Sequence, residues 1–423
     1  MELFSFSILF ILFVSLSVYF IRKSHNNLVQ PHAFYTAKQA VMLLFIPLMQ
    51  FYCTDMFVDR RGVVFFNALI GLSYLSFSAG FLVNKQKVAR ILNQLIRKFN
   101  ITKVPHAVLS IHVILMVSAA TLFYVILAEK SGFGLLAWLQ DPRTGYQFYR
   151  RGTGHLYVVS IATLSFAYLY ILFFWVNNNR KLIAVTTAFV FLLYFYASKM
   201  TILLTIFEAI VFYNFFLRKI KTRQAIVMFC MLLLSFTMLF WSYGSRKDPT
   251  HLSIRILKYA DYYTNGRRFF ADFKDEFQHV YGKEYFDSLW GYVPRAFYPK
   301  KPYSYGVIRY VTEHYYPGAG ASGHTPAFGG PVEEYLNFGL IGIISVGFVR
   351  GYILSLFYTY FLRYRNFVGF VLLSNAMGFQ IFPIVERPPY KVLWYTMNVL
   401  LLFHKQLIKR VVRINQEHLC WDG

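Results

Sequence analysis

The stretch AIVMFCMLLLSFTMLFWSY, residues 225–243, gives way abruptly to GSRKDPTHLSIRILKY, residues 244–259. The first stretch is apolar over about 20 residues, the length that an α-helix needs to cross the hydrocarbon core of a bilayer. The second is polar and basic, and the chain stays polar and aromatic until Pro331, where apolar stretches resume. This boundary predicts a series of membrane-spanning helices that is interrupted by one long segment facing water.

The composition of the whole chain agrees with this prediction. Of its 423 residues, 57% are hydrophobic, 20% are aromatic and 15% are charged, whereas soluble domains are usually about 45–50% apolar. Apolar stretches recur at the length of a spanning helix, while a membrane β-barrel would show alternating strands of about ten residues. We therefore expect an all-α polytopic membrane protein.

We predict eleven spans, and the first of them is expected to remain in the mature protein. It lacks a basic segment before it and a small-residue cleavage pattern after it, which a signal peptide would show. The predicted spans lie near residues 3–21, 39–57, 63–83, 106–127, 156–176, 182–198, 200–217, 225–243, 338–361, 367–384 and 389–404.

The spans divide the chain into four parts. Residues 1–243 hold the first eight spans, with a smaller outer loop at 128–155. Residues 244–332 form the large outer loop, residues 333–404 hold the last three spans, and residues 405–423 form a basic tail.

We attribute the net charge of +24 to the orientation of the chain in the membrane and not to a nucleic-acid ligand. Lys and Arg gather in alternate short loops, beginning with Arg22, Lys23 and Lys38, as the positive-inside rule describes. This pattern predicts that the N-terminus lies outside and the C-terminus in the cytoplasm. We therefore expect no nucleic acid among the partners. The three cysteines, Cys53, Cys230 and Cys420, lie in spans or in the basic tail, so we expect no structural disulfide.

Three segments outside the spans have a pattern of their own. In Lys85–Phe99 the apolar residues share one helical face, which is typical of a helix lying on anionic lipid. The large loop begins as two amphipathic helices, and Asn265-Gly266 is expected to separate them. The Pro- and Gly-rich residues from Val293 to Gly330 predict a loop that packs over the outer mouth of the bundle.

The two outer loops combine many cations with aromatic residues. The planar fork of arginine binds phosphate oxygens in pairs, and Tyr and Trp offer flat apolar faces that suit sugar rings. A lipid-linked phosphosugar is therefore one interpretation, and a charged surface solvated near lipid headgroups is the other. The sequence contains no HExxH, CxxC, Walker A or GxSxG motif, and no GxGxxG in it opens a helix, so we expect no metal, nucleotide or other cofactor.

Two ionisable residues are predicted to lie in mid-span, Glu208 in the seventh span and Arg350 in the ninth. Because a lone charge is costly in lipid, we expect them to pair, unless Arg350 extends its head to an interface. Lys199 is predicted at the outer turn between the sixth and seventh spans. It faces the same outer cavity as the large loop, or it anchors in the lipid headgroups.

Three motifs around the end of the large loop resemble a known family. They are Val293-Pro294-Arg295, then Tyr298-Pro299-Lys300-Lys301-Pro302, and Glu333-Glu334-Tyr335-Leu336-Asn337-Phe338-Gly339-Leu340-Ile341-Gly342. They are similar to the Pro-Arg, Lys-Pro and Glu-x-Tyr-x-Asn-Phe-Gly-x-x-Gly motifs of the Wzy family, the polymerases of O-antigen and oligosaccharide repeat units. The smaller loop, with Arg150-Arg151-Gly152-Thr153-Gly154, resembles an Arg-x-Gly loop of that family.

The resemblance implies a glycosyltransferase with a GT-C-like fold in the inner membrane of a bacterium. Such an enzyme would transfer a glycan from an undecaprenyl-pyrophosphate carrier onto a lipid-linked repeat unit, for lipopolysaccharide O-antigen or for capsule. The pyrophosphate leaving group would supply the energy, and no metal or nucleotide would be needed. A chain-length regulator and a flippase of the same pathway are the partners that the resemblance implies, besides membrane lipids.

The resemblance also assigns roles to residues. Arg295, Lys300 or Lys301, Arg150, Arg151 and Arg246 would hold the pyrophosphate, with Lys199 beside them. Glu333 or His324 would position or deprotonate the acceptor hydroxyl, with Arg295 stabilising charge on the leaving group.

Several of these assignments have alternatives in the sequence. Glu334 is the alternative to Glu333 for the catalytic role. Either acid would also be favourable at the N-terminus of a helix because of the helix dipole alone. For Asn337-Phe338-Gly339 and Gly342 we prefer close helix packing through small residues.

Three other functions compete with a polymerase. A lipid-linked oligosaccharide flippase would show related halves and a charged central cavity. An O-antigen ligase would share fold and chemistry with the polymerase. A membrane acyltransferase would carry a histidine in mid-span, and His112 and His404 lie towards the ends of their predicted spans.

Overall fold

The structure is a computed structural model that describes residues 1–53, 60–96, 106–149, 153–225, 227–228, 234, 262–293, 297–302, 305–319 and 328–378. Within these ranges every regular element is a helix and none is a strand. The all-α prediction is therefore confirmed for the part of the chain that the structure describes.

Among the described residues, five helices are long and apolar enough to cross a membrane. Shorter apolar helices accompany them, namely α11 (Lys199–Phe212), which continues into the π-helical turn η4 (Tyr213–Leu217), and α19 (Phe367–Gly378). The predicted membrane class is confirmed, while the spans predicted at 225–243 and 389–404 lie almost entirely outside the described residues. The five long helices are α1 (Glu2–Lys23), α4 (Val63–Leu82), α6 (His106–Lys130), α9 (Gly154–Trp175) and α18 (Val332–Tyr364).

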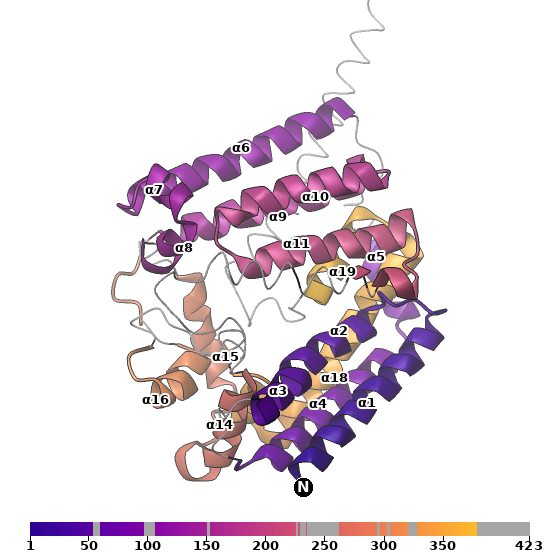
Figure 1. The fold of residues 1–423 in the computed structure, drawn as a ribbon, viewed down its shortest axis with the longest axis vertical. Helices are drawn as coiled ribbons and strands as arrows, with labels where there is room; N and C mark the ends of the chain where they lie inside the picture. The colour runs from indigo at the N-terminus through magenta and orange to yellow at the C-terminus, as the bar shows by residue number, and fades with distance from the viewer. Residues whose placement is uncertain are drawn as a thin grey trace, which may run out of the picture.

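The helices form two packed groups (Figure 1). One core lies among α6, α9, α10 (Asn179–Tyr194), α11 and α19. The other lies among α1, α4, α14 (Tyr262–Glu276), α18 and the turn η1 (Val41–Phe45). Helix α19 contacts both α18 and α11, so it joins the groups.

Helices α4 and α18 approach each other closely because glycines line their interface. A Cβ atom added at Gly80 of α4 would overlap the backbone oxygen of Phe348, and one added at Gly351 would overlap that of Phe77. Gly347 faces Ser73 in the same way. Small residues let membrane helices gain van der Waals contact that lipid cannot supply. The sequence analysis did not identify this seam.

The second span begins earlier than predicted. Helix α2 (Pro31–Ala40) continues through η1 into α3 (Ile46–Cys53), so Lys38 lies in a helix and not in the loop where we expected it. Proline suits the first turn of a helix, and the side-chain oxygen of Gln30 accepts the backbone N–H of His32 at 2.9 Å. These contacts start the helix before its apolar stretch begins.

Two other local predictions have different outcomes. Helix α5 (Gln86–Ile96) is amphipathic as expected, with Val88, Ile91 and Leu95 exposed on its apolar side. The predicted break at Asn265-Gly266 is wrong, because α14 runs through it. Gly266 is needed there for close approach, since an added Cβ would run into Phe66 and the backbone oxygen of Gly329.

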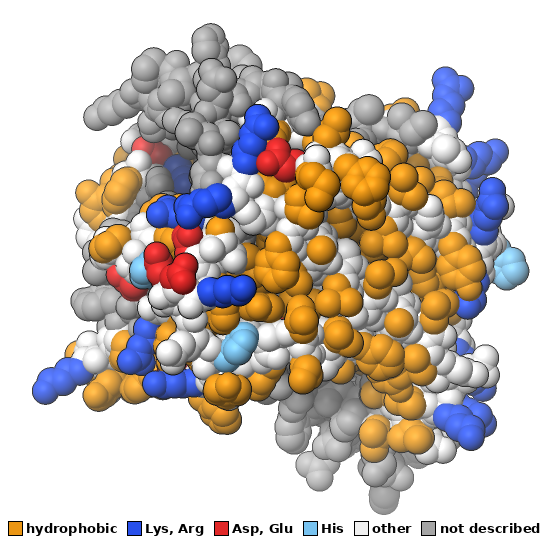
Figure 2. Space-filling view, turned by 90° about the horizontal axis from the view of Figure 1, so that it is seen from below, with side chains coloured by type: hydrophobic (Ala, Val, Ile, Leu, Met, Phe, Trp, Pro, Cys, Tyr) orange, Lys and Arg blue, Asp and Glu red, His pale blue; other side chains and the backbone are white. Residues whose placement is uncertain are grey.

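The two ends of the bundle differ in charge (Figure 2). A band of apolar side chains separates them. One end, formed by the segments 22–30, 83–90, 176–181, 217–223 and 363–366, carries cations and, among the described residues, no Asp or Glu. We call it the basic end. The other, which we call the mixed end, holds α7 (Leu135–Gln140), α8 (Pro142–Thr144), α14, α15 (Lys283–Ser288) and α16 (Glu313–Tyr315), together with all the described acids except Glu208.

Candidate active site

Helix α18 is broken near its start, at the mixed end. Phe338 (φ −140°, ψ 16°) and Gly339 (φ 60°, ψ −145°) leave the helical conformation. A positive φ of this kind is readily adopted only by glycine. The preferred interpretation of Gly339 as a close-packing residue is therefore incomplete, because its main role is the break. Gly342 does pack closely, since an added Cβ would overlap the backbone oxygen of Glu334.

The backbone groups freed by the break are bonded by the loop before α15. Val280 N donates to Leu336 O at 3.0 Å, and Tyr281 N donates to Asn337 O at 3.1 Å. Gly282 N donates to the side-chain oxygen of Asn337 at 3.0 Å. Unsatisfied carbonyls are costly near lipid, so this loop is what makes a broken helix tolerable there.

Three carboxyl groups lie around the break. The buried Glu284 accepts a hydrogen bond from Asn337 Nδ2 at 2.8 Å, and the same nitrogen lies 2.9 Å from the backbone oxygen of Glu333. Glu334, also buried, forms an ion pair with Arg350. Side chains of α15, of the start of α18 and of its middle, where Arg350 lies, thus form one cluster. We call it the carboxyl cluster: Glu284, Glu333, Glu334, Asn337 and Arg350.

The ion pair corrects a prediction. Arg350 pairs with Glu334, and not with Glu208 as expected. The break allows the turn that holds Glu334 to fold back beside Gly342, which brings it towards a residue sixteen positions later in the chain. Glu208 is buried in α11, in the other group of helices.

The carboxyl cluster gives its members different protonation behaviour. Burial and then the charge of Glu333 raise the pKa of Glu284 to about 9, although the hydrogen bond from Asn337 opposes the shift. Burial and then the charge of Glu333 also raise the pKa of Tyr285. At neutral pH Glu284 therefore favours its protonated form beside Glu333. Neighbouring acids held in different states can divide the roles of acid and base.

The segment 305–312 packs against α15 and brings cations and aromatic rings to this end. The backbone of Val307 bonds Glu284, and Arg309 pairs with Asp287 at 3.4 Å. Asp287 also accepts a hydrogen bond from the hydroxyl of Tyr310 at 3.2 Å. The segment 305–312 and α15 therefore place cations, acids and aromatic rings side by side at the mixed end.

Lys301 and Lys300 differ in their surroundings. Lys301 is buried, with its ammonium 4.8 Å from the centre of the Tyr305 ring, a cation–π contact. Lys300 is exposed on the turn before it. Of the two lysines that the sequence left open, Lys301 is thus the one held in place.

Lys199 lies at the start of α11, at the turn where it was predicted. Burial and then the charge of Arg143 lower its pKa to about 8. The structure therefore brings Lys199 towards the smaller polar loop, in which α8 holds Arg143. The remaining predicted residues, Arg150, Arg151, Arg246, Arg295 and His324, lie outside the described residues.

Sequence reasoning missed Glu284 as a member of the site. It lies more than forty positions before Glu333, in a short helix with no motif around it. Only the pairing of residues 280–282 with the broken helix brings it to Asn337. No pattern in the sequence could have indicated that contact.

Comparison with known proteins does not assign the chain to a family. No family model matches the chain, no curated protein matches it, and no solved structure matches it. The assignment of function therefore depends on the residues themselves.

Proposed function

We propose that the protein is a glycan polymerase of the inner bacterial membrane, with the mixed end at the outer face. It transfers a glycan from an undecaprenyl-pyrophosphate carrier onto a lipid-linked repeat unit. The observation that carries this proposal is the carboxyl cluster at a helix break, because it puts a half-buried carboxylate, Glu333, in a membrane protein where a polar loop meets the bundle.

The proposed step needs one base. The acceptor hydroxyl attacks the anomeric carbon of the donor sugar while its proton passes to the Glu333 carboxylate. The bond from that carbon to the pyrophosphate oxygen breaks, and undecaprenyl pyrophosphate leaves with the bonding electrons. Since Glu284 is already protonated, it supports the cluster and leaves Glu333 as the base.

Cations at the mixed end would stabilise the charge that develops on the pyrophosphate. Lys301 is positioned by burial and by its contact with Tyr305, as such a role requires. Arg295, Arg246, Arg150 and Arg151 would complete the set, with His324 as the alternative base, on the strength of the sequence resemblance. The eleven-span topology and the GT-C-like fold belong to the same proposal.

Deleting the gene and examining surface glycan on a gel tests this function. Loss of a polymerase should leave a single repeat unit on the lipid core. A flippase mutant would leave no repeat unit, and a ligase mutant would accumulate polymer on the lipid carrier. Either of these patterns would overturn the proposal.

Labelling of engineered cysteines tests the orientation independently. Tyr281 is 78% exposed at the mixed end, and Asn26 lies in an exposed turn at the basic end. With native cysteines replaced, a membrane-impermeant thiol reagent should label Tyr281→Cys in intact spheroplasts and should label Asn26→Cys only after lysis. The reverse pattern would place the carboxyl cluster in the cytoplasm, where the proposed substrate is not polymerised.

A further inference from the structure

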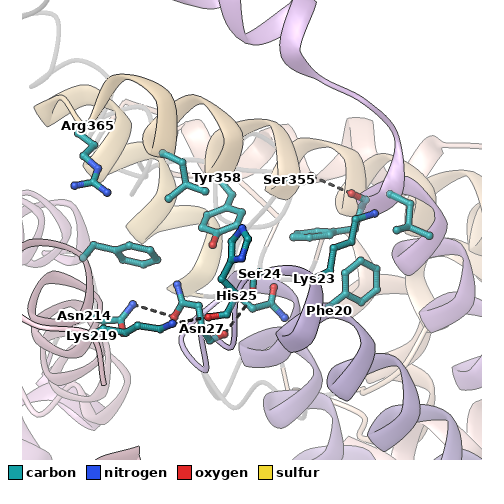
Figure 3. A pocket seen from close by; sticks show the side chains of 15 residues that line it. Phe20, Lys23, Ser24, His25, Asn27, Asn214, Lys219, Ser355, Tyr358 and Arg365 are labelled. Carbon is teal, nitrogen blue, oxygen red and sulfur yellow. Dashed lines mark hydrogen bonds between the residues drawn. The ribbon is translucent and has the colours of Figure 1, made fainter. Parts of the chain in front are cut away.

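The basic end contains a cavity of about 610 Å³ that the proposed function does not use (Figure 3). It opens between the C-terminal ends of α1, α4 and α18 and the turn η4. Three cations line it from three different segments: Lys23, Lys219 and Arg365. None of its described lining residues is acidic. The cavity therefore carries positive charge that no described side chain around it neutralises.

This excess of positive charge affects the pKa of the lysine next to the cavity. Lys85 is buried beside it, and its ammonium donates to the backbone oxygen of Phe81, a lining residue, at 2.7 Å. Burial and then the charge of Lys23 lower the pKa of Lys85 to about 8. An anion in the cavity would reduce the repulsion among these cations.

A buried amide in the lining is left without a hydrogen-bond partner. Gln30 is 1% exposed, and its Oε1 is used to accept the N–H of His32. Its Nε2 has no partner among the described residues. A buried donor without a partner is costly, so this nitrogen indicates an acceptor that the protein itself does not supply.

The remaining polar lining is held rigidly. Asn214 Nδ2 donates to Asn27 Oδ1 at 3.1 Å, while Asn214 Oδ1 accepts the N–H of Ile220 at 3.0 Å. Lys219 donates to the backbone oxygen of His25. These bonds join the turn after α1 to η4, as Figure 3 shows, so the cations on both segments face the cavity from a fixed frame.

The cavity is also open to the apolar surface of the bundle. Leu82 and Leu362 line it and are 44% and 42% exposed, in the position where lipid chains would lie. Phe20, Phe81 and Phe215 complete its apolar lining. A ligand that combines an anionic head with an apolar tail would fit both kinds of surface.

We propose that this cavity binds the phosphate-containing head group of an anionic lipid, with Lys23, Lys219 and Arg365 lining it from different sides, Gln30 Nε2 as a further donor in the lining, and the acyl chains along Leu82 and Leu362. Basic pockets between spanning helices are suited to such headgroups. This site lies at the opposite end from the carboxyl cluster, and the inference does not depend on the proposed reaction.

Two double variants with the same change in charge provide the main test. Lys23→Gln with Arg365→Gln removes two lining cations, whereas Arg22→Gln with Arg363→Gln removes two exposed cations of the same end that do not line the cavity. The full chain in neutral detergent is titrated with phosphatidylglycerol, and bound lipid is counted by native mass spectrometry. We expect the first pair to weaken binding roughly thirtyfold and the second to change it less than threefold.

A single variant tests the cavity without removing a cation. Gln30→Glu keeps the oxygen that accepts the His32 N–H but replaces the unpartnered nitrogen with a negative oxygen. It should weaken lipid binding at least tenfold while the thermal stability of the lipid-free protein stays within a few degrees of the parent.

The source of the phosphate is resolved by competing ligands. Protection against thermal unfolding by phosphatidylglycerol, but not by inorganic phosphate or pyrophosphate, identifies a lipid. Protection by the free anions alone, lost in the first pair of variants, identifies a soluble phosphate as the source. Equal loss of lipid in both pairs of variants, or no bound lipid in the parent protein, would overturn the proposal.

Discussion

Cations have opposite surroundings at the mixed end and at the basic end of the bundle. At the mixed end cations have acidic partners, as in the pairs Arg60–Glu2, Arg309–Asp287 and Arg350–Glu334. At the basic end no ion pair is formed among the described residues, because no described acid lies there. A cation with a partner is fixed in position, which chemistry requires. A cation without an acidic partner is available to bind lipid phosphate, and it helps to set the orientation of the chain in the membrane.

The difference extends to the backbone. At the mixed end a helix is broken, and its freed groups are bonded by the loop at residues 280–282. At the basic end α18 closes regularly, with Arg365 in the left-handed conformation as its cap. Irregular backbone in membrane proteins is tolerated where protein or water covers it. The break therefore marks the mixed end as the place where the protein itself provides a polar environment.

The largest expected effect separates two acids of the carboxyl cluster. Glu333→Gln should lower polymerisation by about 10²–10⁴-fold, because a general base contributes that much. Glu284→Gln should retain most activity, because Glu284 is already protonated at neutral pH and Gln keeps a neutral acceptor for Asn337. The rate of chain extension on purified lipid-linked repeat units measures both. Equal activity in the two variants would remove Glu333 from the mechanism.

The next effect concerns the ion pair that anchors the broken helix. Glu334→Gln leaves Arg350 without its charged partner, and both side chains are largely buried. Removing one member of a buried pair typically costs about 3–5 kcal/mol. Thermal unfolding in detergent should show the loss, and Glu334→Leu with Arg350→Leu should recover most of it. A double variant as unstable as the single one would show that the pair itself does not hold the fold-back.

A smaller effect is expected where the two ends are connected, at the seam of α4 and α18. Gly351→Ala inserts a methyl group against the backbone of Phe77 and should destabilise by about 1–3 kcal/mol. Gly154→Ala is the matched control, because no described residue lies within 4 Å of its added Cβ. Both are followed by thermal unfolding. A neutral Gly351→Ala would mean that the helices are not in close contact there.

The sequence predicted the features that depend on composition and on charge along the chain. The all-helical membrane class and the amphipathic α5 followed from apolar periodicity, which burial in lipid imposes directly. Apart from Lys38, the described cations of the predicted basic loops lie together at the basic end.

The contacts that define the candidate site could not be predicted in this way. Arg350 was assigned to Glu208 because both were expected in mid-span, and the true partner depends on a two-residue break. Gly266 was predicted to break a helix and Gly339 to allow close packing, yet Gly339 breaks a helix and Gly266 allows close packing within a continuous one. The choice depends on tertiary neighbours, which are set by residues far away in the chain.

The smallest effect is a dependence of stability on pH near neutrality, which Glu284 at the mixed end should contribute. The pKa of Glu284 is about 9 in the folded protein and its ordinary value is 4.5, so the folded state binds its proton more tightly. Its contribution is complete below about pH 4.5 and is lost progressively as pH rises towards 9, because the unfolded chain ionises first. Between pH 6 and 7 the loss is at most about 1.4 kcal/mol.

Melting temperatures of the parent and of Glu284→Gln, recorded in detergent over this range, measure that slope. The parent should melt at progressively lower temperature as the pH rises from 5 to 8.5, and Glu284→Gln should be flatter over the same interval. The basic end offers an internal contrast, since Lys85 with its lowered pKa of about 8 responds only towards the upper part of this range. Parallel curves for the two proteins would mean that Glu284 ionises normally, and that the division of protonation states at the helix break does not exist.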